Sequence, residues 1–344
     1  MRAHAVWGMR CGGMRCGGMR CGVCDAGACG VGYVIWAHAM RPYGCWDGGF
    51  LLQLGIMKLV TFRDASGVYV GAIKGDRVIA LDAVAGDMLS LIDQGDAGLA
   101  KARAIVEAAQ GGVALSAVKL LAPIPRPRQN VMCVGMNYVA HAIESDRARG
   151  REPKLPEFPV FFSKAPNAVC GHDDDFELDS KVTTQLDYEV EIAFVMGRTG
   201  KNISKADALS HVFGYTVVND ISARDLQFRH QQFFKGKSLD GSCPVGPCIV
   251  TSDEIPDPGV LGLRLRLNGV TMQDSSVSDL IFNIPTLIES LSLGMTIEAG
   301  TIVSTGTPSG VGIGKTPQQF MKDGDVMEAE IDRIGVLRTR VVAV

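Results

Sequence analysis

Apolar and polar residues begin to alternate regularly at Met57, and the pattern through residue 82 predicts short strands joined by glycine turns. Residues 89–109 carry Leu91, Leu99 and Val106 at spacings typical of one face of a helix. The segment that follows, residues 122–130 (APIPRPRQN), contains three prolines and indicates a linker. We therefore expect a small N-terminal β/α domain over residues 57–124 and a second domain over residues 125–344.

The second domain is expected to be rich in strands. A polar segment, residues 141–159, contains Gly and Pro and predicts a long loop, or a short helix with a loop. Residues 284–293 predict a helix with Pro285 in its first turn, where proline is tolerated. Residues 327–332 alternate apolar and acidic side chains, as a half-buried strand does. Apolar runs predict further strands at residues 131–134, 160–162, 186–196, 214–219 and 299–305. The sequence thus predicts a mixed α/β, β-rich fold.

Residues 1–56 have a different character. Gly8 to Gly22 repeat a Met-Arg-Cys-Gly-Gly unit that has neither helical nor strand periodicity. We expect a disordered, low-complexity extension; a targeting segment and a translation start at Met57 are the alternatives. Cys21-x-x-Cys24 resembles half of a zinc knuckle, but no second well-spaced pair follows it. Cysteines that merely belong to the repeat are therefore the favoured interpretation.

Charge and cysteine content narrow the class of protein. Lys and Arg total 34 against 37 Asp and Glu, and no basic stripe is present, so no nucleic-acid partner is expected. No run reaches the roughly 18 apolar residues that span a membrane. Six of the ten cysteines precede Met57, so the rest of the chain is not a disulfide scaffold. A reducing, cytoplasmic location is expected.

Two glutamates give the first chemical signal. In a strand over residues 186–196, Glu189 and Glu191 project to the same face. That face becomes apolar at Ala193 and Val195, so it is expected to be buried. Neighbouring carboxylates repel each other unless a cation neutralises them, and ligands that are all oxygen suit Mg²⁺ or Mn²⁺. An edge strand whose glutamates are solvated is the alternative.

A third acid, Asp220, follows the apolar run at residues 214–219. If a helix begins near Asp220, then Asp220, Arg224 and Gln227 share one face. That face would bring together an acid, a guanidinium suited to carboxylates, and an amide. The alternative is that Asp220 only caps the helix and that Arg224 lies on the surface.

Five phrases follow one another in a specific order: DYEVEIAFVMGR, GYTVVNDISARDLQ, FFKGKS, SCPVGP and STGTPSGVG. Together they resemble the fumarylacetoacetate hydrolase family, and specifically its acylpyruvase and 2-hydroxyhepta-2,4-diene-1,7-dioate isomerase-like branch. The resemblance implies a rolled mixed β-sheet catalytic domain, a homodimer and a place in aromatic catabolism. It also implies that Glu189, Glu191 and Asp220 bind Mg²⁺ or Mn²⁺, with Ca²⁺ as a further candidate.

The resemblance assigns a catalytic pair to the polar segment. His141 and Glu144 correspond to a dyad that activates water, and their spacing makes them neighbours on a helical turn. On the residues alone, an exposed helical pair without a role would be favoured. Some family members have a fourth acidic ligand where this chain has Val134, so three protein carboxylates are expected here.

The remaining site residues come from the resemblance as well. Lys237 corresponds to an active-site lysine, which would stabilise an enolate or oxyanion. Its neighbour Lys235 is expected to be solvated. Arg224, Gln227 and Thr307 correspond to residues that contact the carboxylate and oxo groups of the substrate.

Two segments resemble other kinds of site but do not match them. Residues 310–316 (GVGIGKT) are similar to a phosphate-binding loop, but that pattern needs glycine where Ser309 stands. His172 precedes three aspartates, which could suggest a second metal site. A solvated acidic turn is the favoured interpretation.

The predicted substrate is a small 2-oxo acid. A metal that binds its 1-carboxylate and 2-oxo oxygens would stabilise an enolate at C3. Because a dyad is present to activate water, we favour hydrolysis of a C–C bond in a 2,4-dioxo acid such as an acylpyruvate. Decarboxylation of oxaloacetate or isomerisation of 2-hydroxy-diene dioates would use the same enolate and stays open. A non-catalytic protein that binds a metal or keto acid is the third alternative, but it would need a broken dyad or a missing lysine.

Overall fold

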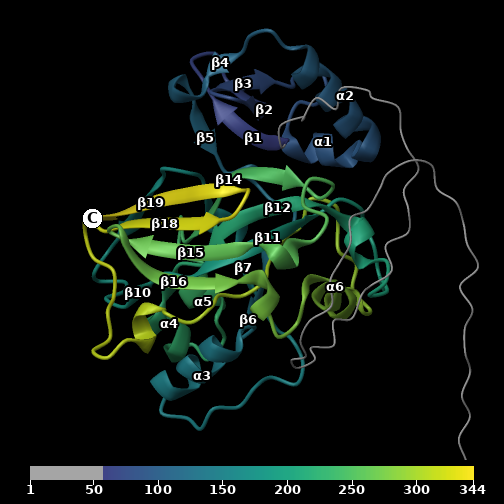
Figure 1. The fold of residues 1–344 in the computed structure, drawn as a ribbon. Coiled ribbons are helices and arrows are strands. Elements are labelled where there is room, and N and C mark those ends of the chain that lie inside the picture. Colours follow the sequence, from purple (N-terminus) through teal and green to yellow (C-terminus); the bar gives the residue numbers. More distant parts are fainter. Residues whose placement is uncertain (1–56) are drawn as a thin grey trace, which may run out of the picture. The chain divides into compact units, whose positions relative to one another are not determined.

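The computed structural model describes residues 57–344, which belong to one compact unit (Figure 1). The predictions made for residues 1–56, the Cys21 and Cys24 pair included, lie outside the described residues. The helices are α1 (Met88–Asp93), α2 (Gly95–Ala108), α3 (Val139–Ala148), α4 (Arg224–Arg229), α5 (Phe234–Lys237) and α6 (Ile284–Ser292). No helix of the described residues is both long and apolar enough to cross a membrane.

Strands dominate the fold, which confirms the mixed α/β, β-rich prediction. A 12-stranded sheet follows the order β4-β3-β2-β1-β14-β12-β11-β17-β6-β7, with β5 paired to β1 and β8 paired to β14. Its strands are β1 (Lys58–Arg63), β2 (Val68–Lys74), β3 (Arg77–Ala80), β4 (Val113–Ala114), β5 (Lys119–Leu121), β6 (Val131–Gly135), β7 (Val160–Lys164), β8 (Val169–Cys170), β11 (Val190–Met196), β12 (Val212–Asn219), β14 (Cys243–Thr251) and β17 (Ile302–Ser304).

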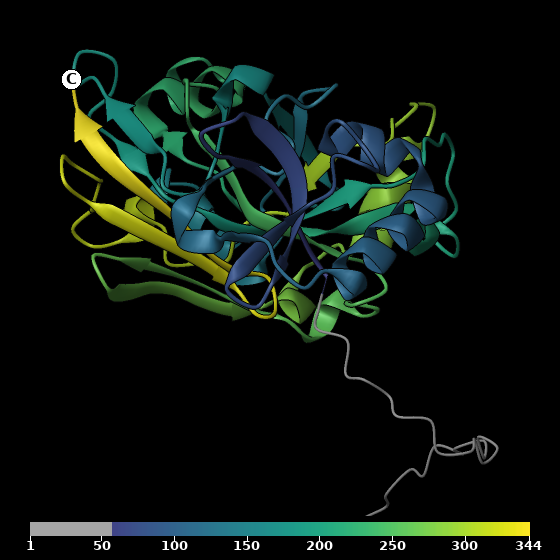
Figure 2. The same cartoon turned by 90° about the horizontal axis from the view of Figure 1, so that it is seen from above.

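A smaller sheet of five strands has the order β16-β15-β18-β19-β9, and most of it runs along one side of the molecule in Figure 2. Its strands are β9 (Asp175–Leu178), β15 (Gly262–Leu267), β16 (Val270–Ser276), β18 (Val326–Ile331) and β19 (Gly335–Ala343). A short pair, β10 (Leu186–Asp187) with β13 (Ser222–Ala223), stands apart from both sheets.

The strand β11 is buried on both faces, as the sequence predicts. On one face Val190, Ile192 and Phe194 join a core that also contains side chains of β15 and β18. On the other face Ala193 and Val195 join a second core, to which α1 contributes. The alternative of an edge strand is wrong, because β11 pairs with both β12 and β17.

Several predicted element boundaries are corrected. The single helix over residues 89–109 is two helices, α1 and α2, which meet at Gly95 with a φ of 55°. The strand over residues 186–196 is interrupted between β10 and β11. No helix starts at Asp220: Ser222 and Ala223 pair with β10, and α4 begins only at Arg224.

The two parts proposed from the sequence share one sheet. Strand β1 pairs antiparallel with β14, so the strands of residues 58–121 extend the sheet formed by the rest of the chain. The domain boundary predicted between residues 124 and 125 stays a prediction. Helices α3, α4 and α5 lie at the opposite end of this unit from α1 and α2 (Figure 1), and they enclose the candidate site.

Candidate metal and substrate site

Three carboxylates converge where β11 begins and β12 ends. Glu191 lies in β11, Glu189 just precedes that strand, and Asp220 follows β12. The antiparallel register brings them together, and the Asp220 amide donates to the Glu189 carbonyl at 2.8 Å. One oxygen of each carboxylate lies within 4.8 Å of the others, and all three residues are buried. Within residues 57–344, this is the one acid, His or Cys cluster that could hold a metal ion.

The charge of this cluster fits a divalent cation. Burial, together with the carboxylates of Asp220 and Glu189, raises the pKa of Glu191 to about 8. One Glu191 oxygen, Oε2, accepts from Ser304 Oγ at 2.6 Å and from the Gly306 amide at 2.8 Å. These bonds fix the carboxylate in place. Because the donors are all oxygen and carry excess negative charge, they suit Mg²⁺ or Mn²⁺.

Two buried lysines hold the acids in this structure. Lys237 Nζ, at the end of α5, donates to Glu189 Oε2 at 2.7 Å and to Asp220 Oδ2 at 2.6 Å. Lys164 Nζ, at the end of β7, donates to Asp220 Oδ1 at 2.6 Å and to the Ile221 carbonyl at 3.0 Å. Lys164 is not among the site residues predicted from the sequence, where its only signal is a lysine placed just after an apolar run. Lys235 is exposed, as predicted.

Arg224 reaches the cluster from the first residue of α4. Its Nε donates to Asp187 Oδ2 at 2.9 Å, and its Nη2 lies 2.7 Å from Glu189 Oε1. Its Nη1 donates to Gln227 Oε1 at 3.1 Å, so these two predicted residues do meet. Burial opposes ionisation of Glu189, but the cations of Lys237 and Arg224 hold its pKa below the ordinary value. Asp187, which is fully buried and pairs with this guanidinium, is a further residue that was not predicted from the sequence.

The predicted dyad lies on α3. His141 is buried and lines the same cavity as Glu189, Glu191 and Lys237. Its Nδ1 is 3.4 Å from Glu144 Oε2. The spacing of three residues therefore does place the two side chains together, while Val134 contributes only an apolar part of the cavity wall.

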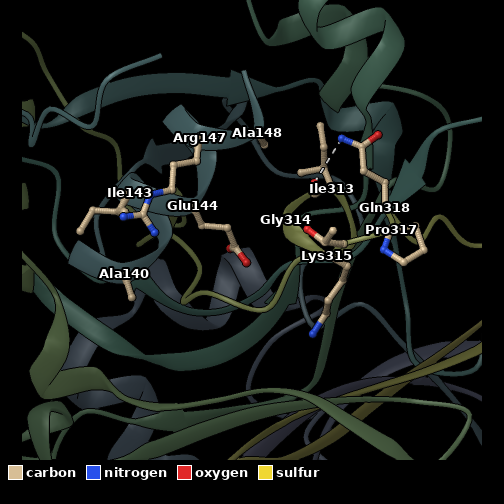
Figure 3. A pocket seen from close by; sticks show the side chains of 11 residues that line it. Ala140, Ile143, Glu144, Arg147, Ala148, Ile313, Gly314, Lys315, Pro317 and Gln318 are labelled. Atoms are coloured by element: carbon tan, nitrogen blue, oxygen red, sulfur yellow. Dashed lines mark hydrogen bonds between the residues drawn. The ribbon is translucent and has the colours of Figure 1, made fainter. Parts of the chain in front are cut away.

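The loop that contains Gly310 holds the Glu144 carboxylate. The Gly310 amide donates to the two Glu144 oxygens at 3.1 and 3.2 Å. Glu144 also faces a second cavity of about 720 Å³, between α3 and residues 313–318 (Figure 3). His141 thus faces the inner cavity, and Glu144 faces the outer one.

The same loop explains why the similarity to a phosphate-binding loop fails. The amides of Gly312 and Ile313 donate to the two oxygens of Asp187, at 2.7 and 3.0 Å. Backbone donors that could hold a phosphate therefore hold the protein's own carboxylates, those of Glu144 and Asp187. Thr307, just before this loop, lines the inner cavity and donates to the Val190 carbonyl at 2.9 Å.

The acidic turn after His172 is neutralised by nearby bases. Each of its three aspartates forms an ion pair with a different basic residue; the pairs are Asp173 with Arg338, Asp174 with Lys119, and Asp175 with Arg340. Charges that are matched one to one leave no demand for a metal ion. The structure thus agrees with the interpretation as an acidic turn.

A model of the family described as "Fumarylacetoacetate (FAA) hydrolase C-terminal" matches residues 130–342, which include every site residue named above. This chain belongs to the fumarylacetoacetate hydrolase family. The resemblance seen in the ordered phrases is thereby confirmed, and the strand-rich mixed fold agrees with it. The roles of the individual site residues stay predictions.

Relatives within the family include enzymes of different classes. The chain is 46% identical over 304 residues to "Oxaloacetate tautomerase YisK" of Bacillus subtilis, with 83% of this chain and 100% of that protein covered. Among solved structures, a fumarylacetoacetate hydrolase from Exiguobacterium antarcticum has 37% identity and a TM-score of 0.70, covering 84% of this chain and 100% of that one. A 2-hydroxyhepta-2,4-diene-1,7-dioate isomerase from Mycobacterium marinum has 30% identity and a TM-score of 0.65, covering 83% and 98%.

Proposed function

We propose that this chain is a metal-dependent enzyme that interconverts the enol and keto forms of oxaloacetate or a closely similar 2-oxo acid. The observation that carries the proposal is the buried carboxylate cluster, two of whose acids contact Lys237, in a chain that matches a tautomerase over that protein's whole length. The sequence alone favours C–C hydrolysis and leaves isomerisation open as an alternative. With these observations, isomerisation is the better supported of the two reactions.

The proposed cofactor is Mg²⁺ or Mn²⁺, held by Glu189, Glu191 and Asp220. When bound to a 2-oxo acid, such an ion makes the C3 protons more acidic. Lys237 already lies against two of these ligands, so it is placed to donate a hydrogen bond to the substrate's enolate oxygen.

The proton that moves at C3 requires a base in the cavity. Because Glu144 contacts His141 at Nδ1, the other ring nitrogen, Nε2, is the one available to take that proton and return it. Glu144 would hold the imidazole in a fixed orientation. Gln227 and Thr307, which line the same cavity, are the proposed contacts for the substrate's polar groups.

Hydrolysis of a 2,4-dioxo acid is the second candidate. The His141–Glu144 contact favours it, because the same pair could activate water instead of moving a proton at C3. The hydrolase from Exiguobacterium antarcticum shares the fold. The two reactions give different products and can be separated directly.

The test begins with oxaloacetate supplied as the enol. Malate dehydrogenase, which uses only the keto form, reports tautomerisation through NADH oxidation; lactate dehydrogenase reports pyruvate from acylpyruvates or from decarboxylation. Faster keto formation than with Mg²⁺ alone, lost in Glu191→Gln, is the expected result. Pyruvate release from acylpyruvates without any acceleration of tautomerisation would replace the proposal with the hydrolase. The homodimer and the cytoplasmic location stay predictions that these assays do not address.

A further inference from the structure

One cation of the inner cavity has no anion to pair with. Arg149, at the C-terminal end of α3, lines the same cavity as Glu189 and Lys237. Its guanidinium lies over two aromatic rings, with its central carbon 5.0 Å from the Phe228 centroid and 5.6 Å from that of Phe233. Stacking of this kind fixes the plane of a guanidinium and leaves the N–H groups on its edge free to donate.

The carboxylates of Asp146 and Glu189 favour the charged form of Arg149 but do not pair with it. Within residues 57–344, it forms no ion pair, and its buried Nε has no hydrogen-bond partner. Buried donors are rarely left unpaired, because losing water without gaining a partner costs free energy. Burial, together with the cations of Arg151 and Arg224, also lowers the pKa of this guanidinium. An anion placed here would relieve both effects.

The other buried cations of the site are already engaged. Arg224 pairs with Asp187 and Glu189, while Lys164 and Lys237 pair with the carboxylate cluster. A second carboxylate on the substrate would therefore find its charge partner at Arg149. The planar guanidinium can also donate two parallel hydrogen bonds to a carboxylate.

We propose that Arg149 binds the distal carboxylate of the substrate, so that the site selects 2-oxo acids with two carboxylates over those with one. The inference rests on the proposed function for its choice of 2-oxo acids. It adds a specificity-determining residue at the C-terminal end of α3.

Calorimetric titration in the presence of Mg²⁺ tests the proposal without turnover as the readout. Oxaloacetate and 2-oxoglutarate carry a distal carboxylate at two chain lengths, and 2-oxobutanoate lacks it. Arg149→Gln should weaken binding of at least one dicarboxylate by about 10- to 100-fold, the usual effect of losing a hydrogen bond to a charged group. Binding of 2-oxobutanoate should stay within about twofold, because its carboxylate does not use this residue.

Two matched variants make the result specific. Arg151→Gln removes an exposed cation two residues away and should leave all three affinities unchanged. Arg149→Lys keeps the charge but loses the planar fork, so it should restore only part of the dicarboxylate affinity. Melting temperature and Mg²⁺ affinity, measured alongside, should match the wild type in every variant.

Equal losses for the one- and two-carboxylate ligands, or no loss for any of them, would overturn the assignment. A separate failure is also recognisable. If dicarboxylate binding depends on Arg149 but enol oxaloacetate is not tautomerised faster, the proposed reaction is wrong while the distal carboxylate site stands.

Discussion

Substitution of Gly314 by alanine should displace the proposed His141–Glu144 dyad without touching the proposed metal ligands. A Cβ at Gly314 would lie against the Glu144 carboxylate, well inside the 3.0 Å that real Cβ atoms keep. The φ of Gly314 is not in the left-handed region, so alanine adds no backbone strain there. Glu144 must therefore shift by roughly 1 Å from its place beside the Gly310 amide and His141.

The size of the effect follows from that shift. A misplacement of about 1 Å in a catalytic group costs on the order of 10²-fold in rate. Glu144 is partly exposed, so water can replace its lost hydrogen bonds. Alanine also lowers the conformational entropy of the unfolded chain, which raises the free energy of unfolding by about 0.4–1 kcal/mol. We therefore expect kcat for tautomerisation to fall about 100-fold, with KM, Mg²⁺ affinity and melting temperature nearly unchanged.

The assay is the coupled measurement with malate dehydrogenase, run at saturating Mg²⁺. Gly86→Ala is the matched control, because a Cβ there meets nothing within 4 Å and its φ is also ordinary. An unchanged kcat in Gly314→Ala would refute the role given to the position of Glu144. A parallel loss of Mg²⁺ affinity would show instead that the damage spreads to the metal site.

Four further outcomes are expected. Saturating Mg²⁺ at 100 times its Kd should stabilise the protein by about 2.7 kcal/mol in thermal unfolding, and Glu191→Gln should remove most of that gain. Lys237→Met should bind Mg²⁺ more tightly by calorimetry, because the competing ammonium is gone, yet turn over slowly. Lys164→Met should lower the free energy of unfolding by about 3–5 kcal/mol, since it leaves a buried Asp220 oxygen unpaired; a change below 1 kcal/mol would contradict this. A chain that starts at Met57 should keep the kcat and melting temperature of the full chain, and insolubility would reveal a role for the extension.

The parts of the fold that were predictable are those in which the pattern is local. Periodicity located the buried strands β11 and β12 and the helix α6 to within a few residues, because each buries whole faces. It failed where a tertiary contact overrides the local preference. The segment after Asp220 could begin a helix, but its pairing with β10 delays α4 to Arg224.

The site itself was predictable only in part. Spacing put Glu189 beside Glu191, and the ordered phrases added Asp220, but the charges that balance them come from distant segments. Lys164 is 56 residues from Asp220 in the sequence, and the Gly310 amide is 166 residues from Glu144. Neither lysine nor glycine at such positions has a pattern of its own. Only the folded chain shows that both are committed to carboxylates of the site.

The charge balance of the site argues for a dicarboxylic substrate. The cluster buries four acids and three bases, and with every acid ionised, as metal binding requires, they leave one net negative charge; they are Asp187, Glu189, Glu191 and Asp220, with Lys164, Lys237 and Arg224. A divalent ion would change this to one net positive charge, which the carboxylate next to the oxo group neutralises. A distal carboxylate would then stand unpaired in a buried cavity, where an isolated charge is costly. Arg149 supplies the missing positive charge, whereas a substrate with one carboxylate leaves that guanidinium unmatched. Preference for two carboxylates therefore follows from the whole cavity and not from a single contact.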